Sequence, residues 1–105
     1  MPNKVKEIVM YKIKDGLQLE FDKLKTQMIG DSCAITGLFS SVSSKSLDQD
    51  NVYIDTMIWE SKALAEASFP EFQALPLTQD FFALMDGKPL FHQFLEYIPD
   101  NIAEL

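Results

Sequence analysis

The sequence predicts an α+β fold of the ferredoxin-like, split βαβ kind, in which a four-stranded antiparallel sheet carries its helices on one face. The first observation is the order of patterns along the 105 residues, which runs strand, helix, strand, strand, helices, strand. The second is a hairpin, in which a turn at 48–51 joins two runs of strand character. The third is that the strand predicted over 52–60 is largely apolar on both faces, so each face needs a cover.

The first strand is predicted over residues 4–14, where side-chain character alternates. Val9 and Tyr11 share one face, and Ile8 and Met10 share the other. Because lysines flank the second pair, only the middle of this strand is apolar on both sides.

A helix is predicted after Asp15, which would form a capping box with Gln18. Polar residues of this helix, among them Asp22 and Lys25, are assigned to the solvent side. Its apolar stripe consists of Leu17, Phe21, Leu24 and Met28.

The helix is expected to continue through residues 33–35 to a C-cap at Gly37. The next strand, over 38–47, is rich in serine and suits the edge of a sheet, where polar residues discourage unwanted pairing. The strand over 52–60 follows, and Ser61 is predicted to cap a second helix.

Pro70 and Pro76 are expected to interrupt the chain after that helix. Thr78 is predicted to cap a third helix that ends at Asp86 and the glycine after it. A last strand is predicted over 90–98, again mostly apolar on both faces.

The sheet face that the helices leave open is too apolar for water on the first, third and fourth strands. An apolar patch of that size marks an interface. Two such sheets packed face to face would close an eight-stranded barrel with two-fold symmetry. The sequence therefore favours a homodimer through the open sheet face, against the alternative of a monomer with one solvated face.

Length and composition predict one domain over residues 1–105. A net charge of −7, with nine lysines and no arginine, argues against nucleic acid as a partner. No apolar run approaches the ~20 residues of a membrane span. A single cysteine, Cys33, and a start without an apolar signal segment predict a cytoplasmic protein.

Two segments resemble the antibiotic biosynthesis monooxygenase-like family of the dimeric α+β barrel superfamily. They are Gly37-Leu-Phe, and the run 55–64 in which Trp59, Glu and Ser lead from a strand into a helix. The similarity extends over roughly residues 5–98. It implies the dimeric barrel and, in the quinone-forming members, oxygenation without metal or flavin, because the deprotonated aromatic substrate itself reacts with oxygen.

In those members an Asn and a Trp on the third strand face the pocket, and the equivalent positions here are Asp55 and Trp59. Asp55 departs from the pattern, since an ionised carboxylate accepts hydrogen bonds but cannot donate one. A helix tyrosine of the family falls near Ala65, and its arginine has no equivalent. The haem-degrading branch is disfavoured, because Val9 takes the place of its strand-one Asn and the second helix holds no His.

Asp55 and His92 are the candidate catalytic residues. A carboxylate on an apolar strand face needs a partner or acts as a general base, so Asp55 either takes a substrate proton or bonds a neighbouring hydroxyl or water. His92, the only histidine, exchanges a proton near neutral pH or is structural. The sequence does not say which sheet face His92 occupies. One histidine without nearby cysteine predicts no metal site.

The candidate substrate-binding residues are aromatic. Trp59 would wall a pocket by ring stacking, or fill the core with its indole N–H bonded to a backbone carbonyl. Tyr11 and Tyr53 would place hydroxyls in the same pocket, and Phe82 would line it from the helix side.

Two functions remain open. The first is a cofactor-independent monooxygenase of a small aromatic or polyketide-like molecule, with Asp55 or His92 taking a proton while Trp59 and Tyr53 hold the ring. The second is a non-catalytic dimeric domain that binds a small apolar ligand or serves in a stress response.

Overall fold

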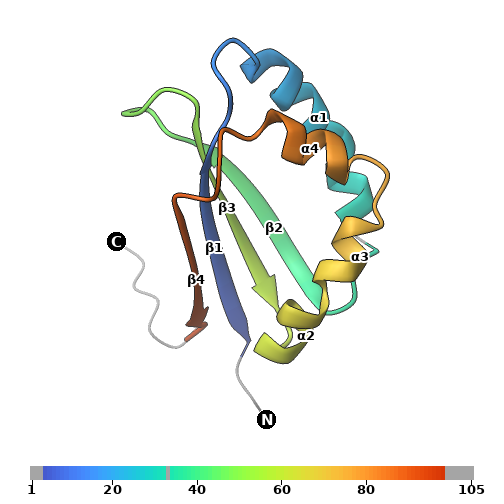
Figure 1. Cartoon of the computed structure of the whole chain (residues 1–105). Helices are drawn as coiled ribbons and strands as arrows, with labels where there is room; N and C mark the ends of the chain where they lie inside the picture. Colours follow the sequence, from blue (N-terminus) through green and yellow to red (C-terminus); the bar gives the residue numbers. More distant parts are fainter. Residues whose placement is uncertain (1–3, 33, 99–105) are drawn as a thin grey trace.

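The computed structural model describes residues 4–32 and 34–98 (Figure 1). Its elements are β1 (Val5–Lys12), α1 (Gln18–Ser32), β2 (Leu38–Lys45), β3 (Val52–Trp59), α2 (Lys62–Ala67), α3 (Phe69–Gln73), α4 (Thr78–Leu84) and β4 (Phe91–Glu96). The predicted order of elements is confirmed, with the short helix α3 as an addition. Within the described ranges, no helix combines the length and apolar character that crossing a membrane requires.

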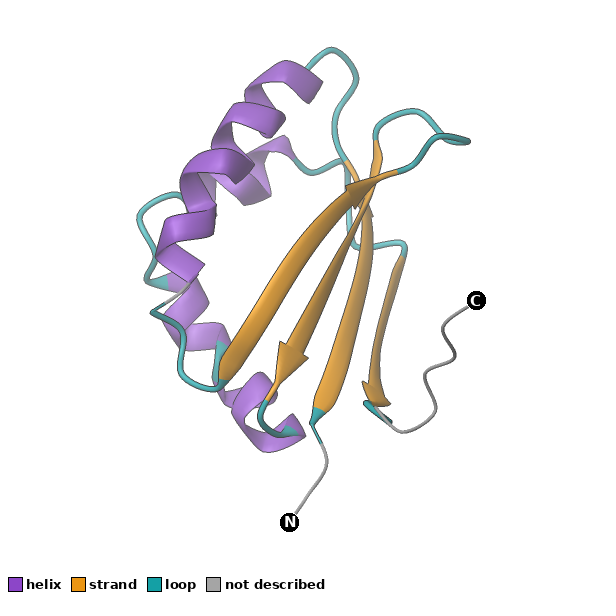
Figure 2. Cartoon of the chain, turned by 180° about the vertical axis from the view of Figure 1, so that it is seen from behind, coloured by secondary structure: helices purple, strands orange, loops and turns teal. Residues whose placement is uncertain are grey.

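The four strands form one antiparallel sheet in the order β2-β3-β1-β4. β1 and β3 are therefore central, and the serine-rich β2 lies at an edge, as predicted. The helices all lie on one side of the sheet (Figures 1 and 2). This is the predicted ferredoxin-like α+β arrangement.

The register of the sheet sets which residues share a row across it. Val9 of β1 pairs with Asp55 of β3 on one side and with His92 of β4 on the other. Asp55 pairs in turn with Ser43 of β2. Because alternate residues of a strand share a face, this row lies on the helix side together with Tyr11 and its neighbours.

The main core lies between this face and the helices α1 and α4. Its buried residues are Tyr11, Ile13, Phe21, Leu24, Met28, Tyr53 and Phe81. The rings of Phe21 and Tyr53 pack with their centroids 4.5 Å apart. Three of the four predicted stripe residues of α1 are thus buried, and Leu17 packs against them partly exposed.

The predicted capping box at the start of α1 is wrong. The helix begins at Gln18, and the Asp15 carboxylate accepts a hydrogen bond from the Asn51 side-chain amide. Gln18 donates to the Asn51 side-chain oxygen. Asn51 is buried in the left-handed conformation (φ 66°), so it joins the β2–β3 turn to the start of α1.

The predicted continuation of α1 to Gly37 is also wrong where the chain is described. The helix ends at Ser32, and the Ala34 N–H bonds to the Asp31 carbonyl in a turn. Ile35, beyond the end of the helix, packs with Trp59 and Ala65 in a second core cluster. Cys33 lies outside the described residues.

The later boundary signals had different outcomes. Ser61 caps α2 as predicted, accepting a hydrogen bond from the Leu64 N–H at 3.1 Å. Thr78 does not cap α4: it lies inside the helix, fully buried, and its hydroxyl donates to the Phe72 carbonyl at 2.5 Å. Pro76 lies in the break between α3 and α4, as predicted, whereas Pro70 lies in the first turn of α3, where its missing N–H costs little.

All four predicted strands and the third predicted helix are shorter in the structure. α4 ends at Leu84, before Asp86, because Met85 pairs with Ile13 in a single β-bridge. The edge strands β2 and β4 stop two residues short of the predicted ends at 47 and 98.

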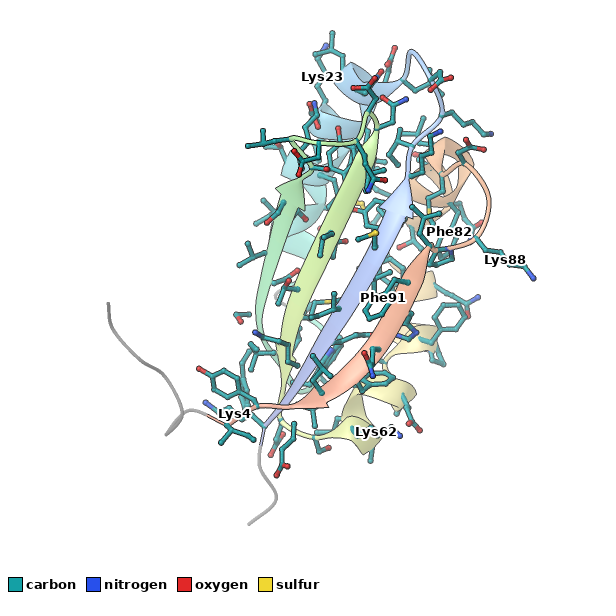
Figure 3. The ribbon with its side chains drawn as sticks, turned by 90° about the vertical axis from the view of Figure 1, so that its left-hand side faces the viewer. Lys4, Lys23, Lys62, Phe82, Lys88 and Phe91 are labelled. Atoms are coloured by element: carbon teal, nitrogen blue, oxygen red, sulfur yellow. The ribbon has the colours of Figure 1, made fainter. Side chains whose placement is uncertain are left out.

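The sheet face opposite the helices carries an apolar surface, here called the open face (Figure 3). By the pairing of the strands it consists of Ile8, Met10, Val42, Ile54, Ile58, Phe91 and Leu95. Val42, Phe91 and Leu95 are exposed, and the central residues are half-buried.

Candidate functional site

A cavity of about 1080 Å³ lies between the helix side of the sheet and the helices. Its size is at the upper end of ordinary small-molecule sites, which hold roughly 300–1,000 Å³. All six predicted site residues line it: Tyr11, Tyr53, Asp55, Trp59, Phe82 and His92. The structure therefore brings them together around one space, and their functional roles stay predictions.

The Asp55 carboxylate accepts hydrogen bonds from three donors. They are the Tyr11 hydroxyl at 2.9 Å, the Ser43 hydroxyl at 2.7 Å and the Lys25 ammonium at 2.9 Å. Asp55 is only 8% exposed, and a buried carboxylate needs such partners. Of the two interpretations open for Asp55, bonding to a neighbouring hydroxyl is the one the geometry shows.

Lys25 is a site residue that sequence reasoning placed wrongly, on the solvent side of α1. Its side chain is 20% exposed, and its Nζ lies 5.2 Å from the centroid of the Phe81 ring. A signal was available, because Lys25 follows Phe21 by four residues and so lies beside the apolar stripe. Asp22 is on the solvent side as predicted, with its side chain 51% exposed, and it also accepts a hydrogen bond from Tyr53 at 3.0 Å at the edge of the cavity.

The two tyrosines are hydrogen-bond donors rather than bases. Burial, with the Asp22 carboxylate as the next cause, raises the pKa of Tyr53 to about 12. Burial and then the Asp55 charge raise the pKa of Tyr11 still further. Both phenols therefore keep their protons at neutral pH.

A second polar cluster forms around Glu7 of β1. The Trp59 indole N–H donates to Glu7 Oε1 at 2.9 Å, and His92 Nε2 lies 2.5 Å from Glu7 Oε2. Trp59 is thus bonded to a carboxylate, not to the backbone carbonyl that one interpretation expected. His92 faces the helix side, edge-on to Phe94 with ring centroids 5.0 Å apart.

Sequence reasoning missed Glu7 altogether. Its signal was strand alternation, because Glu7 lies between Val5 and Val9 on the inward face of β1. An acidic residue on such a face needs a partner, just as Asp55 does.

The two clusters lie at opposite sides of an apolar floor. Asp55 and His92 are separated by one strand, which places their Cα atoms ~10 Å apart. Val9 lies between them, and Met57 lies beside Asp55 on the same face. This arrangement suits a flat molecule with polar groups at two ends.

Phe82 of α4 is on the helix wall of the cavity. Its ring contacts Phe72 and Phe81, each with centroids 5.8 Å apart, and it is partly exposed. Within residues 4–32 and 34–98, no three side chains of the types that bind metals gather into a possible ion site.

The fold is of the ferredoxin-like α+β class, and comparison with solved structures gives the relatives of that fold. SnoaB from Streptomyces nogalater, described as a cofactor-independent oxygenase, superposes with a TM-score of 0.71 at 16% identity, over 90% of this chain and 93% of that one. A candidate antibiotic biosynthesis monooxygenase from Bordetella bronchiseptica gives 0.74 at 14% identity, over 91% and 98%. One from Caulobacter crescentus gives 0.73 at 13% identity, over 92% of both chains.

The chain therefore has the fold of the antibiotic biosynthesis monooxygenases, and the predicted resemblance is confirmed at that level. No model of a known protein family matches the sequence, and a search of curated proteins also found no match.

Proposed function

We propose that the protein is a cofactor-independent monooxygenase of a flat, apolar molecule that carries an acidic hydroxyl or methylene group. The observation that carries this proposal is the hydrogen-bonded Glu7–His92 pair at one end of the apolar cavity floor. The shared fold with SnoaB supports it.

His92 is the base in this proposal. Its Nε2 donates to Glu7, which leaves Nδ1 as an acceptor for a proton from the substrate. The resulting substrate anion reduces dioxygen. For a doubly activated methylene the balance is CH₂ plus O₂ giving a carbonyl and water, so one oxygen atom enters the product and the other leaves as water.

Asp55 has a structural role in this proposal. Its three donors already occupy the carboxylate, so it holds Lys25 and Tyr11 in place rather than taking the proton. Tyr53 and Phe82 would contact the rings of the bound molecule.

The charges around the cavity favour a substrate that enters neutral. The lining holds four carboxylates against two lysines, Lys25 and Lys45. The carboxylates are Glu7, Asp22, Asp55 and Glu66. A negative surplus in a confined space repels anionic ligands.

The second candidate, a non-catalytic ligand-binding domain, is favoured by one observation. The residue at the family's Asn position is a carboxylate that already accepts hydrogen bonds from three donors of the protein itself. A site of that kind can bind an apolar molecule without activating it.

Turnover separates the two functions. The protein is incubated with a panel of hydroquinones and anthrones while oxygen uptake and carbonyl product are followed. We expect His92→Gln to lose about 10²–10⁴-fold in rate, as removal of a general base does. Asp55→Asn and Trp59→Phe test the other predicted residues, and Lys88→Gln, an exposed residue outside the cavity, is the control.

Wild-type protein that binds panel members, detected through the fluorescence of Trp59, but consumes no oxygen would establish the second candidate instead. If the His92→Gln variant turns over at the wild-type rate, His92 is not the base of the reaction.

We further propose that two copies pair through the open face into the dimeric barrel, which would cover its apolar residues. One domain over residues 1–105, a cytoplasmic location and the lack of nucleic-acid partners stay predictions, which rest on length, the single cysteine and the net charge of −7.

A further inference from the structure

We infer that Glu7 is the positioning residue of the site: it fixes the tautomer of His92, and Trp59 holds Glu7 in turn. The inference rests on the proposed function in one respect: a fixed tautomer is useful only if His92 takes a proton from the substrate. It also changes the predicted part of Trp59, from stacking on a ligand to orienting a carboxylate.

The geometry that carries the inference is a single carboxylate with one partner on each oxygen. Oε1 accepts from the indole N–H and Oε2 faces the imidazole Nε2. The Glu7 side chain is 14% exposed, whereas that of His92 is 46% exposed. The carboxylate is therefore held at the cavity wall while the imidazole remains accessible from the cavity.

Trp59 is suited to hold the carboxylate and poorly suited to stack on a ligand. It is 3% exposed and packs with Ile35 and Ala65 in a core cluster. An indole N–H can only donate, so in its bond to Glu7 the carboxylate oxygen is always the acceptor.

A fixed tautomer matters because a neutral imidazole has one donor nitrogen and one acceptor nitrogen. With the proton on Nε2 directed at Glu7, the lone pair of Nδ1 is available to the substrate. When Nδ1 gains the substrate's proton, the imidazolium lies against the Glu7 carboxylate, which compensates its charge. Serine proteases use a carboxylate on an imidazole in the same way.

The tautomer is directly measurable, because His92 is the only histidine and gives one set of imidazole signals. In wild-type protein at a pH where the imidazole is neutral, ¹⁵N NMR should show the Nε2–H form as the main species. Glu7→Gln should move the population toward a mixture, because an amide can either accept from Nε2–H or donate to a bare Nε2. Trp59→Phe should move it in the same direction, and the exposed Glu60→Gln should leave the spectrum unchanged.

The wild-type spectrum alone can overturn the inference, even if the variants do not fold: a main species with the proton on Nδ1 excludes it. A Glu7→Gln protein that folds and keeps the wild-type tautomer also excludes it.

Kinetics add a readout that a purely structural Glu7 would not give. If the enzyme turns over, Glu7→Gln should lower kcat by about 10²-fold or more with KM nearly unchanged, as loss of tautomer control does. The two proposals fail separately. If His92 has the Nε2–H tautomer but the protein shows no turnover, the monooxygenase proposal is contradicted. If the protein turns over but Glu7→Gln leaves the tautomer of His92 unchanged, the positioning role of Glu7 is contradicted.

Discussion

Two carboxylates on the same sheet face show how neighbours decide what an acidic residue does. Asp55 is bonded by two hydroxyls and an ammonium, all of which satisfy it internally. Glu7 is bonded by an indole N–H and by the His92 imidazole, whose second nitrogen is the proposed proton acceptor. Only the second arrangement connects a carboxylate to a group that can take a proton from a ligand.

Tyr53 predicts an alkaline limit to stability. Its pKa is raised from 10.0 in the unfolded chain to about 12 in the folded protein. Its contribution is therefore complete below pH 10 and is lost as the pH rises toward about 12, because the unfolded chain releases its proton first. Tm should fall over this interval, and Tyr53→Phe should show a shallower fall, measured by circular dichroism at stepped pH. Equal slopes in the two proteins would contradict the assignment.

The sequence predicted the positions of the site side chains better than their partners. Strand alternation correctly placed Val9 and Tyr11 on one face, because a period of two depends on the strand alone. The partners Lys25 and Glu7 were not found, since they lie 30 and 52 residues from the groups they bond. Such pairs are set by the register of the sheet and the docking of α1, which no local pattern specifies.

At the scale of elements, the join between α2 and the sheet depends on Gly37. This residue has φ +83°, and a Cβ built there would lie 2.9 Å from Cδ1 and 3.0 Å from Cβ of Leu64. Its carbonyl also accepts a hydrogen bond from the Glu60 N–H at 2.8 Å. The absence of a side chain lets the first turn of α2 lie directly against the start of β2.

Gly37→Ala should therefore cost more stability than Gly16→Ala. Both glycines have left-handed φ values, each worth about 1–2 kcal/mol against alanine. Only Gly37 adds a steric clash, worth about 1–3 kcal/mol more. Urea denaturation measures both free energies of unfolding. Equal losses would mean that Leu64 moves aside without cost.

The capping predictions failed where tertiary partners competed for the cap. The Ser61 hydroxyl accepts from the helix backbone, so the local rule held there. Asp15 and Thr78 have the right residue types, but Asn51 and the Phe72 carbonyl take up their side chains. The order of elements survived these errors because apolar periodicity, which a whole face of packing enforces, does not depend on one hydrogen bond.

At the scale of the whole molecule, the helices cover only one side of a sheet that is apolar on both. The predicted homodimer through the open face follows from this asymmetry (Figure 3). Light scattering should give twice the chain mass of 11.9 kDa. Ile54→Lys, at the half-buried centre of the open face, should give the single-chain mass, because an unpaired charge in an interface is costly.

Leu47→Lys is the matched control for that change. Leu47 is 99% exposed in the β2–β3 turn, outside the strands that form the open face, so the same substitution there should leave the mass doubled. A wild-type mass of one chain at every concentration would refute the dimer.

The place of β4 has a consequence for the lifetime of the site. Among the described strands, β4 is bonded to β1 alone, and most of its residues are exposed. Amide hydrogens of such an edge strand exchange with solvent through local fraying, well before the molecule as a whole unfolds. His92 lies in β4, so each fraying event separates its side chain from Glu7. Warming should therefore abolish proton transfer to His92 at temperatures where the aromatic core is still folded.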